Sequence, residues 1–465
     1  MPKNPVTIMN RRAFLNHART VGLGFAGLQF AASCGYLGRE ATSSMARPFG
    51  PLIPDPEGIL DLPRGFTYQI VSRTGDMMSD GHQVPGRPDG MAAFALDNGM
   101  VALIRNHELN PDDDALSGLQ GALPDRRAFY DFGRGRPALG GTSTVIYNTA
   151  TRQVEQQSMS LLGTLRNCAG GATPWNSWLT CEEVVLSANN DRWERDHGYV
   201  FEVPATDRIQ LASPEPIRAM GRFNHEAVAV DPISGCVYLT EDEHDGCLYR
   251  FIPKQRETLT AGGKLQAMAV DLPGGQDTRN WNEVSIRPSH SATVRWIDLD
   301  DVDNPMDDLR KRAQAKGAAI FARGEGMWFG LDKVYFACTN GGAIKKGQIW
   351  AYQPSLYEGQ AQEAEHRGEL TLFVESTDAG LLENADNLTV APWGDLIVCE
   401  DGSGDQFLVG VQPDGSLYSF ARNAISDSEF AGSTFSPDGS TLFVNIQHTG
   451  LTLAIHGPWP NRDRG

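Results

Sequence analysis

Residues 89–108 read DGMAAFALDNGMVALIRNHE, and the prediction of the fold begins with them. A mostly apolar run leads to an Asn-Gly pair, and a second apolar run leads away from it to polar residues. Asn-Gly between two such runs is typical of a tight β-hairpin. We therefore expect two antiparallel strands here, with Asp89 and Glu108 at the same edge of the hairpin.

The same pattern recurs five more times along the chain. The later copies are CAGGATPWNSWLTCEE from Cys168, HEAVAVDPISGCVYLTED from His225, EGMWFGLDKVYFACTN from Glu325, DNLTVAPWGDLIVCED from Asp386 and EFAGSTFSPDGSTLFVNIQ from Glu429. Six hairpins over about 400 residues give roughly 65–70 residues per repeat. Radially repeated sheets of this kind predict an all-β fold, a six-bladed β-propeller. A pair of β-sandwiches is the alternative, and it does not explain six matched hairpins.

Segments outside the hairpins complete this prediction. The strand-like residues 66–72 (FTYQIVS) stand alone before the first copy, so we expect this N-terminal strand to close the last blade. Residues 109–138 and 254–322 interrupt the pattern as insertions. In the second insertion, Asn304 and Pro305 predict a helix start, and the helix is expected to run to Ala319.

The first 44 residues are predicted to be a targeting segment. Arg11 and Arg12 precede Phe14 and Leu15, and a short apolar run from Val21 to Ser33 follows. This order is typical of a twin-arginine signal peptide. The expected domains are thus a signal peptide over 1–44 and a single catalytic propeller over 45–465, in the periplasm or secreted. An amphipathic helix of the mature protein is the alternative, and Cys34 leaves a lipid anchor open.

The charge of the chain narrows the classes of partner. It has 58 acidic and 40 basic side chains, a formal charge of −18, and removal of residues 1–44 would leave 57 and 35, a charge of −22. Such a chain repels phosphate backbones, so nucleic-acid binding is not expected. We find no apolar run long enough to span a membrane, which takes about 20 residues. An acidic balance suits a protein that holds multivalent cations.

Potential metal ligands occupy the ends of the hairpins that would meet at one mouth of the channel. The strand openings carry Asp89, Cys168, Glu226, Glu325, Asp386 with Asn387, and Glu429; the far ends carry Glu108, Glu182 with Glu183, Glu241 with Asp242, Asn340, Glu400 with Asp401, and Gln447. Strand ends are often acidic because they meet solvent, and this ordinary explanation stays open for any one copy. Many carboxylates at one mouth repel one another unless cations neutralise them. Oxygen donors favour Ca²⁺, whereas the Cys168 thiolate favours a transition metal such as iron.

Several motifs resemble the bacterial PhoX alkaline phosphatases. They are Arg166–Gly171 (RNCAGG), Thr173–Trp175 with Trp178–Glu183, Arg105–Glu108 (RNHE), Gly221–Val228 (GRFNHEAV), Cys399–Gly402 (CEDG) and Glu429–Gly432. The resemblance covers about 58–458 and implies a six-bladed propeller whose mouth holds Fe³⁺ and Ca²⁺ and hydrolyses phosphate monoesters. It implies that Cys168 binds iron, with Glu226 and Glu325 in the same cluster.

The resemblance assigns other residues less firmly. Weaker metal candidates are Asp386, Asn387, Glu400, Asp401, Glu108, Glu182 and Glu241. Arg323 stands where the family places a phosphate-contacting arginine. Independently of the resemblance, we select Lys345 or Lys346 on the same blade as the second choice for a substrate-binding cation. Many members read Arg-Pro-Glu at 323–325, whereas this chain has Arg-Gly-Glu, which puts the substrate range in doubt.

The expected function is an exported, metal-dependent phosphatase whose partners are small phosphorylated substrates and the twin-arginine export machinery. No GxSxG, HExxH or P-loop motif supports another hydrolase mechanism. Two alternatives remain open: a non-catalytic propeller whose metals only stabilise the mouth, and a calcium-dependent lactonase-type propeller. The lactonase type has no need of a thiolate ligand, so the iron content of the protein separates it from the phosphatase.

Overall fold

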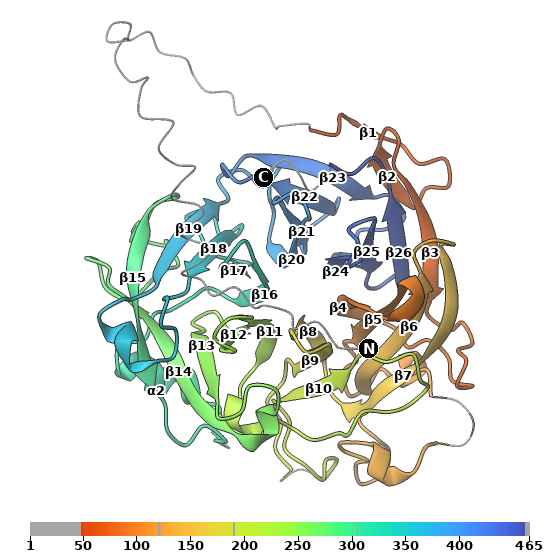
Figure 1. The fold of residues 1–465 in the computed structure, drawn as a ribbon, viewed down its shortest axis with the longest axis horizontal. Helices are drawn as coiled ribbons and strands as arrows, with labels where there is room; N and C mark the ends of the chain where they lie inside the picture. The colour runs from red at the N-terminus through yellow and green to blue at the C-terminus, as the bar shows by residue number, and fades with distance from the viewer. Residues whose placement is uncertain (1–47, 120, 122, 189–190, 305, 461–465) are drawn as a thin grey trace, which may run out of the picture. The chain divides into compact units, whose positions relative to one another are not determined.

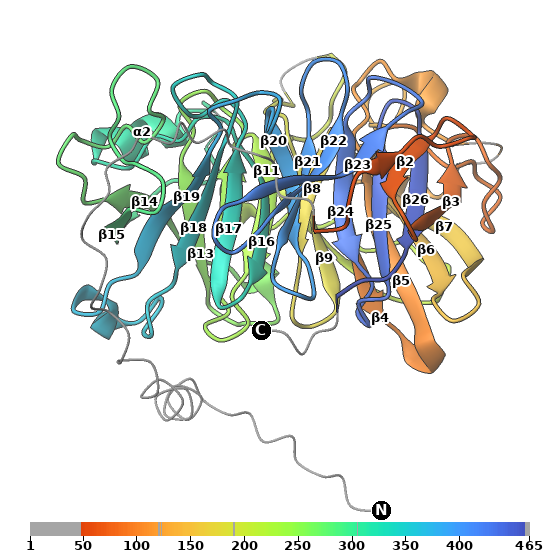
Figure 2. The same ribbon diagram turned by 90° about the horizontal axis from the view of Figure 1, so that it is seen from above.

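A computed structural model describes residues 48–119, 121, 123–188, 191–304 and 306–460. All of them belong to one unit of the chain, Met45–Gly465. This unit is all-β, with many antiparallel strands in a propeller-like arrangement and few short helices (Figure 1). Seen from the side, the strands run between two faces (Figure 2). The predicted signal peptide and Cys34 lie outside the described residues.

The strands form five hydrogen-bonded sheets. The first is β4 (Pro88–Ala95), β5 (Met100–His107), β6 (Gly140–Asn148) and β7 (Gln153–Thr164); the second is β8 (Asn167–Ala172), β9 (Ser177–Glu182) and β10 (Val200–Pro204). The third has nine strands in the order β11 (His225–Val230), β12 (Val237–Glu241), β13 (Leu248–Pro253), β14 (Gly263–Val270), β15 (Ser291–Asp298), β19 (Glu369–Glu375), β18 (Gln348–Gln353), β17 (Lys333–Cys338) and β16 (Gly324–Gly330). The fourth is β20 (Ala385–Val390), β21 (Leu396–Glu400), β22 (Phe407–Val411), β23 (Leu417–Asn423), β2 (Leu60–Pro63) and β1 (Leu52–Ile53). The fifth is β24 (Phe430–Phe435), β25 (Thr441–Ile446), β26 (Leu451–His456) and β3 (Thr67–Arg73).

Each of the six hairpins predicted from the sequence is an antiparallel pair of strands. The pairs are β4/β5, β8/β9, β11/β12, β16/β17, β20/β21 and β24/β25. The first strand of each pair packs against the first strand of the next pair, and β24 packs against β4. The six first strands therefore form a closed circuit around the middle of the unit (Figure 1).

The expectation of six separate blades is met only in part. Two of the hairpins share the nine-stranded sheet, because β15 pairs with β14 on one side and with β19 on the other. The pairing with β19 joins only Ser291–Thr293 to Glu369–Thr371. The insertion at 254–322 supplies β14 and β15, so it links two hairpin units into one sheet.

The N-terminal strand closes the last sheet, as predicted. Strand β3 pairs with β26 along its whole length, and β26 is the third strand of the final hairpin unit. Strand β2 adds to β23 in the neighbouring sheet. The start of the chain thus covers two sheet edges that would otherwise be free to pair with other molecules.

The helix predicted in the second insertion is shorter than expected. Helix α2 spans Leu309–Ala315, with Asp308 at its N-cap, and it does not begin after Asn304 or reach Ala319. Gly317 has φ +92°, and the Ala318 N–H bonds back to the Ala313 carbonyl, which ends the helix. The Ala319 N–H then donates to Met268 of β14. Pro305 lies outside the described residues.

The first strands pack so closely that glycine is required at several contacts. A Cβ at Gly171 would lie 1.9 Å from the Val228 carbonyl oxygen, and one at Gly90 would lie 2.6 Å from Ala169 Cα. About 20 Å³ of space is left among the residues that line the channel here. That is room for about one water molecule, so the first strands pack closely at this level of the channel.

Substitution of Gly171 by Ala should destabilise the fold. The new methyl group meets backbone of β11 that cannot move without opening the circuit, so we expect a loss of about 1–3 kcal/mol in urea unfolding. Gly274→Ala is the matched control, because a Cβ at exposed Gly274 meets nothing within 4 Å. Equal stability of the two variants would contradict the close packing described here.

Candidate metal centre

A β-bulge recurs at the same place in five of the six first strands. The register of each hairpin shifts between a first paired residue and the third residue after it, at Pro88/Met91, Asn167/Gly170, His225/Val228, Gly324/Met327 and Ala385/Leu388. The residue directly after the first paired one is Asp89, Cys168, Glu226, Glu325 and Asp386, respectively. Bulges re-aim side chains at functional sites. The repeat thus places one potential ligand at an equivalent point of five strands.

A backbone hydrogen bond repeats in all six hairpins just outside these residues. The N–H of the residue that follows the second strand donates to the carbonyl of the residue that precedes the first strand. The pairs are Glu108–Arg87, Glu183–Arg166, Asp242–Asn224, Thr339–Arg323, Asp401–Asn384 and Gln447–Glu429, at 3.0–3.3 Å. These bonds bring four more carboxylates, Glu108, Glu183, Asp242 and Asp401, to the mouth.

The sixth hairpin departs from this pattern. Its register shifts between Ala431 and Thr434, so Ala431 occupies the position that holds a potential ligand in the other five copies. Glu429 instead takes the position that Arg87, Arg166 and Arg323 hold in their hairpins. Its carboxylate therefore comes from the residue directly before the first strand, two positions before the one that carries the potential ligand in the other five hairpins.

The side chains from different hairpins meet in three overlapping groups. These are Cys168, Glu183 and Glu226; Glu226, Glu325 and Asp386; and Asp386, Asp401 and Glu429. Within each group, one donor atom per residue lies within 4.8 Å of the donor atoms of the others. Two oxygens that bind one Ca²⁺ are separated by at most about 5 Å, so each group fits a single ion. Glu226 and Asp386 are shared and link the three groups in a row.

Cys168 gives the first group its particular chemistry. The thiol is 5% exposed and donates a hydrogen bond to Glu226 Oε2 at 2.8 Å. Burial and the negative charge of Glu226 raise the pKa of this thiol well above its usual range. A cation at the group would reverse this effect, because thiolates bind metals once the proton has left. Sulfur and carboxylate donors together suit iron, whereas the all-oxygen groups suit calcium.

The carboxyl groups of the row raise one another's pKa values. Burial together with Glu325 raises the pKa of Glu226, and burial together with Asp242 raises that of Glu325, both well above the usual range. Burial and the charge of Asp401 raise the pKa of Asp386 to about 7. Without cations, the mouth can therefore hold its full negative charge only at a large electrostatic cost.

Three arginines flank the row from equivalent backbone positions. Arg87, Arg166 and Arg323 each precede a first strand, with φ between +45° and +50°. This left-handed conformation is unfavourable for a residue with a Cβ, so the surrounding structure holds it in place. The mouth therefore contains positive charge at defined places as well as acids.

Their guanidinium groups bind different partners. Arg323 donates to both Asp242 oxygens at 2.7 and 2.8 Å and lies 2.9 Å from Glu325 Oε1. Arg166 bonds to Glu108 at 2.8 Å and to Glu183 at 2.6 Å. Both side chains are about one-third exposed, at 33% and 34%. Arg87 instead contacts Asp113 and His448.

Three of the predicted weaker ligands form hydrogen bonds with other parts of the fold and lie outside the three groups. Glu182 accepts hydrogen bonds from Leu165, Gly198, Tyr199 and His197; Glu241 from Cys247 and Tyr249; and Glu400 from Glu383 and Phe407. None of these carboxylates belongs to the three groups. Side chains alternate along a strand, so the next residue in the chain points to the mouth at each of these places: Glu183, Asp242 and Asp401.

The remaining predicted residues lie at varied distances from the row. Gln447 donates to Glu108 and to Asp89, which places both carboxylates beside the ring of first strands. Asn387 donates to Asp386 at 3.0 Å and accepts from the Gly432 N–H, so it orients a carboxylate in the structure. Lys345 is exposed and stacks on Trp281, and Lys346 pairs with Glu383.

The other cysteines do not compete for the role of Cys168. Among the described residues all six cysteines are free and buried. Cys181, Cys338 and Cys399 lie inside second strands, as expected from the sequence, and are fully buried. None of them belongs to the groups that could hold a metal.

Sequence reasoning placed Asp89, Glu183, Asp242 and Glu429 at the mouth but did not select them as ligands. The missing signal was the alternation of the second strand, which separates Glu183 from Glu182. Sequence reasoning selected Arg323 but not Arg166 as a phosphate-binding arginine, although both stand two residues before a predicted ligand.

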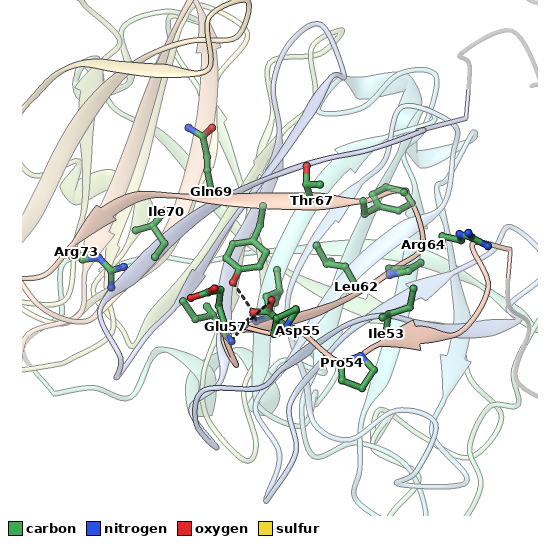
Figure 3. Close-up of a pocket in the computed structure, with 17 residues that line it drawn as sticks. Ile53, Pro54, Asp55, Glu57, Leu62, Arg64, Thr67, Gln69, Ile70 and Arg73 are labelled. Carbon is green, nitrogen blue, oxygen red and sulfur yellow. Dashed lines mark hydrogen bonds between the residues drawn. The ribbon is translucent and has the colours of Figure 1, made fainter.

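A separate pocket of about 620 Å³ lies among Ile53–Arg73, between the N-terminal strands (Figure 3). Asp55 organises its wall, accepting hydrogen bonds from the Tyr68 hydroxyl at 2.5 Å and from the Ile59 N–H at 2.8 Å. The pocket shares no residue with the candidate metal centre. In the part of the chain that the structure describes, no helix combines the length and apolar character needed to cross a membrane.

Comparison with known proteins identifies one matching family. The model of the family described as alkaline phosphatase PhoX matches residues 47–450. No curated protein sequence matches the chain. Among solved structures, Pseudomonas fluorescens PhoX in complex with vanadate, a transition-state analogue, has a TM-score of 0.64 at 19% identity, over 86% of this chain and 96% of that chain. This likeness concerns the fold.

Two further structures match less well. A gluconolactonase from Xanthomonas campestris has a TM-score of 0.34 at 13% identity, over 89% of this chain and 100% of that chain. The Cps50 (Swd1) β-propeller domain of Myceliophteria thermophila has a TM-score of 0.41 at 10% identity, over 84% of this chain and 100% of that chain.

The crowded carboxylates predict a specific pH dependence for the metal-free protein. A group whose pKa is raised on folding stabilises the fold below its unfolded value, and this stability is lost as the pH rises through the folded value. For Asp386 this window runs from 3.8 to about 7. Asp386→Asn treated with a chelator should therefore unfold at a higher temperature than chelated wild type at pH 8. The difference should vanish towards pH 4.

Added Ca²⁺ provides the control for this comparison. With the ion bound, the Asp386 carboxylate becomes favourable, and wild type should be the more stable protein at pH 8. Identical melting temperatures of the two proteins in both conditions would mean that Asp386 neither repels its neighbours nor binds a cation.

Proposed function

The chain belongs to the alkaline phosphatase PhoX family, and from this premise we propose that it hydrolyses phosphate monoesters at the mouth described above. The observation that carries the proposal is the row of Cys168, Glu183, Glu226, Glu325, Asp386, Asp401 and Glu429 in three linked groups. Phosphoryl transfer needs charge neutralisation and positioning more than covalent chemistry from the protein. A row of cation sites flanked by arginines meets both needs.

We propose Fe³⁺ and Ca²⁺ as the ions. Cys168, Glu183 and Glu226 would hold iron, because this is the group with a sulfur donor. Glu325, Asp386, Asp401 and Glu429 offer only oxygens and would hold calcium. When bound, such cations neutralise the carboxylates, polarise phosphoryl oxygens and lower the pKa of water.

The two arginines would bind and orient the phosphoryl group. Asp242 fixes the Arg323 guanidinium by two hydrogen bonds, and Glu108 with Glu183 fixes that of Arg166. Each guanidinium has five N–H donors, so donors remain for phosphoryl oxygens. Burial lowers and neighbouring carboxylates raise the pKa of Arg323, with a net rise, so it stays charged. Because both guanidinium groups are partly exposed at the mouth, substrate would reach them from that side.

Export and domain organisation remain part of the proposal. The Arg11–Ser33 segment supports a twin-arginine signal over 1–44 and a periplasmic or secreted enzyme, with a single catalytic domain over 45–465. We interpret the nine-stranded sheet as two blades joined through β15. This gives six blades, in agreement with the six equivalent hairpins and their closed circuit of first strands.

The role of Cys168 is tested by Cys168→Ala. Loss of the sulfur donor should remove iron from the purified protein and lower kcat on p-nitrophenyl phosphate by at least about 100-fold. Cys338→Ala is the matched control, because that buried thiol lies inside a second strand and outside the three groups. Full iron content and activity in Cys168→Ala would refute the proposed centre.

The arginines are tested with vanadate, the analogue bound in the Pseudomonas fluorescens structure. Arg323→Ala and Arg166→Ala should each weaken inhibition by vanadate and raise KM by about 10–100-fold, because each removes a charged hydrogen bond. Arg87→Ala is matched in backbone conformation and should change neither value by more than about twofold, since Arg87 contacts Asp113 and His448. An equal effect of all three variants would contradict the assignment.

A further inference from the structure

We propose that Lys345 is a specificity-determining residue that favours phosphate monoesters whose alcohol part carries a second negative charge. The inference rests on the proposed phosphatase function and adds a substrate class to it. Lys345 was predicted from the sequence as a second-choice substrate-binding cation, and its contacts lie outside the candidate metal centre.

The loop that carries Lys345 lies at the rim of the mouth. Residues 339–347 follow the end of β17, and the two ends of this loop are tied to neighbouring hairpins. The Thr339 N–H donates to the Arg323 carbonyl at 3.0 Å, and the Asn384 N–H donates to the Lys346 carbonyl at 2.8 Å. Arg323 and Asn384 hold equivalent positions directly before β16 and β20. The lysine therefore stands between two neighbouring positions of the ring around the metal centre.

The Lys345 ammonium is held by an aromatic ring instead of an acid. Its Nζ lies 4.5 Å from the centre of the Trp281 ring. Trp281 donates from Nε1 to the Asn340 carbonyl at 2.6 Å, and the Gly342 N–H donates to the Arg279 carbonyl at 2.8 Å. These bonds fix the indole to the loop. A cation–π contact positions an ammonium without neutralising its charge.

The neighbouring cations of this region are neutralised. Lys346 pairs with Glu383, and Arg279 pairs with Asp277 at 2.7 Å. Within the described residues, Lys345 forms no ion pair with a carboxylate. The indole therefore positions the Lys345 ammonium at the rim while its charge stays uncompensated.

The backbone at Lys345 supports a role for its side chain. The residue has φ +58°, a left-handed conformation that glycine or asparagine adopts more readily. Lys345 is also exposed, so no core packing requires a long side chain there. A substitution at this position should therefore leave the fold intact, and its effect on specificity can be measured separately from stability.

The position of the Lys345 ammonium at the rim of the mouth determines the proposed substrate class. Arg323 and Arg166 are placed to bind the phosphoryl group at the centre, so a cation further out meets the alcohol part of the ester. An ammonium there attracts a carboxylate or a second phosphate on that part. The effect of one such charge near a protein surface is about fivefold in kcat/KM.

The test compares 3-phosphoglycerate with glycerol 3-phosphate, two esters of similar size that differ in one carboxylate. Lys345→Met should lower kcat/KM for 3-phosphoglycerate about fivefold and leave that for glycerol 3-phosphate within about twofold. Lys345→Arg keeps the charge and should retain the preference of wild type. Lys346→Met is the matched control from the same loop and should change neither value, because its ammonium is already paired. High salt should weaken the wild-type preference for 3-phosphoglycerate.

Two failures are distinguishable. If the metal-loaded wild type hydrolyses neither ester, the proposed phosphatase function is wrong and this inference falls with it. If both esters are hydrolysed and Lys345→Met leaves the ratio of the two kcat/KM values unchanged, the phosphatase stands and the role of Lys345 is overturned.

Discussion

The repulsion among carboxylates at the mouth is the constraint on which the rest of the structure depends. Seven potential ligands from five hairpins lie in one row, and burial together with the negative charges of neighbouring carboxylates raises the pKa values of Glu226, Glu325 and Asp386. Such a row persists only if its charge is neutralised. The arginines supply part of this neutralisation, and protons or bound cations can supply the remainder.

The hairpin repeat explains how side chains so far apart in the sequence reach one place. Each first strand contributes at one point, and a bulge at that point re-aims the side chain in five copies. Close packing of the first strands holds these points together, which is why Gly171 must lack a side chain against Val228. The repeat therefore brings equivalent positions of the hairpins together at the mouth. The residue types at these positions differ, with sulfur at Cys168, carboxylates at Glu226 and Glu325, and a small side chain at Ala431.

The sequence alone predicted the hairpins, the closing strand β3 and the exceptional position of Cys168, because each rests on local pattern and on the shared edge of a hairpin. It could not separate Glu182 from Glu183, since both lie at a strand end and only the pairing with β10 and the bond to Arg166 decide which one faces the mouth. The fusion of two units through β15 depended on pairing between residues that are about 80 positions apart, such as Ser291 and Thr371, for which no local signal exists. Helix α2 ended early because of Gly317, a signal that was present in the sequence but was not used.

The residues that directly precede the six first strands share a backbone hydrogen bond but differ in their side chains. Arg87, Arg166 and Arg323 share a left-handed conformation and a backbone bond to the second strand, yet only Arg166 and Arg323 pair with acids of the mouth. Each of these two arginines joins acids of two hairpins: Arg166 binds Glu108 and Glu183, and Arg323 binds Asp242 and Glu325. A guanidinium in this place links two hairpins at the mouth and keeps N–H donors that these acids do not use. In the sixth hairpin the carboxylate of Glu429 stands at this position, whereas the third and fifth hairpins have Asn224 and Asn384, so the charge around the mouth differs from one hairpin to the next.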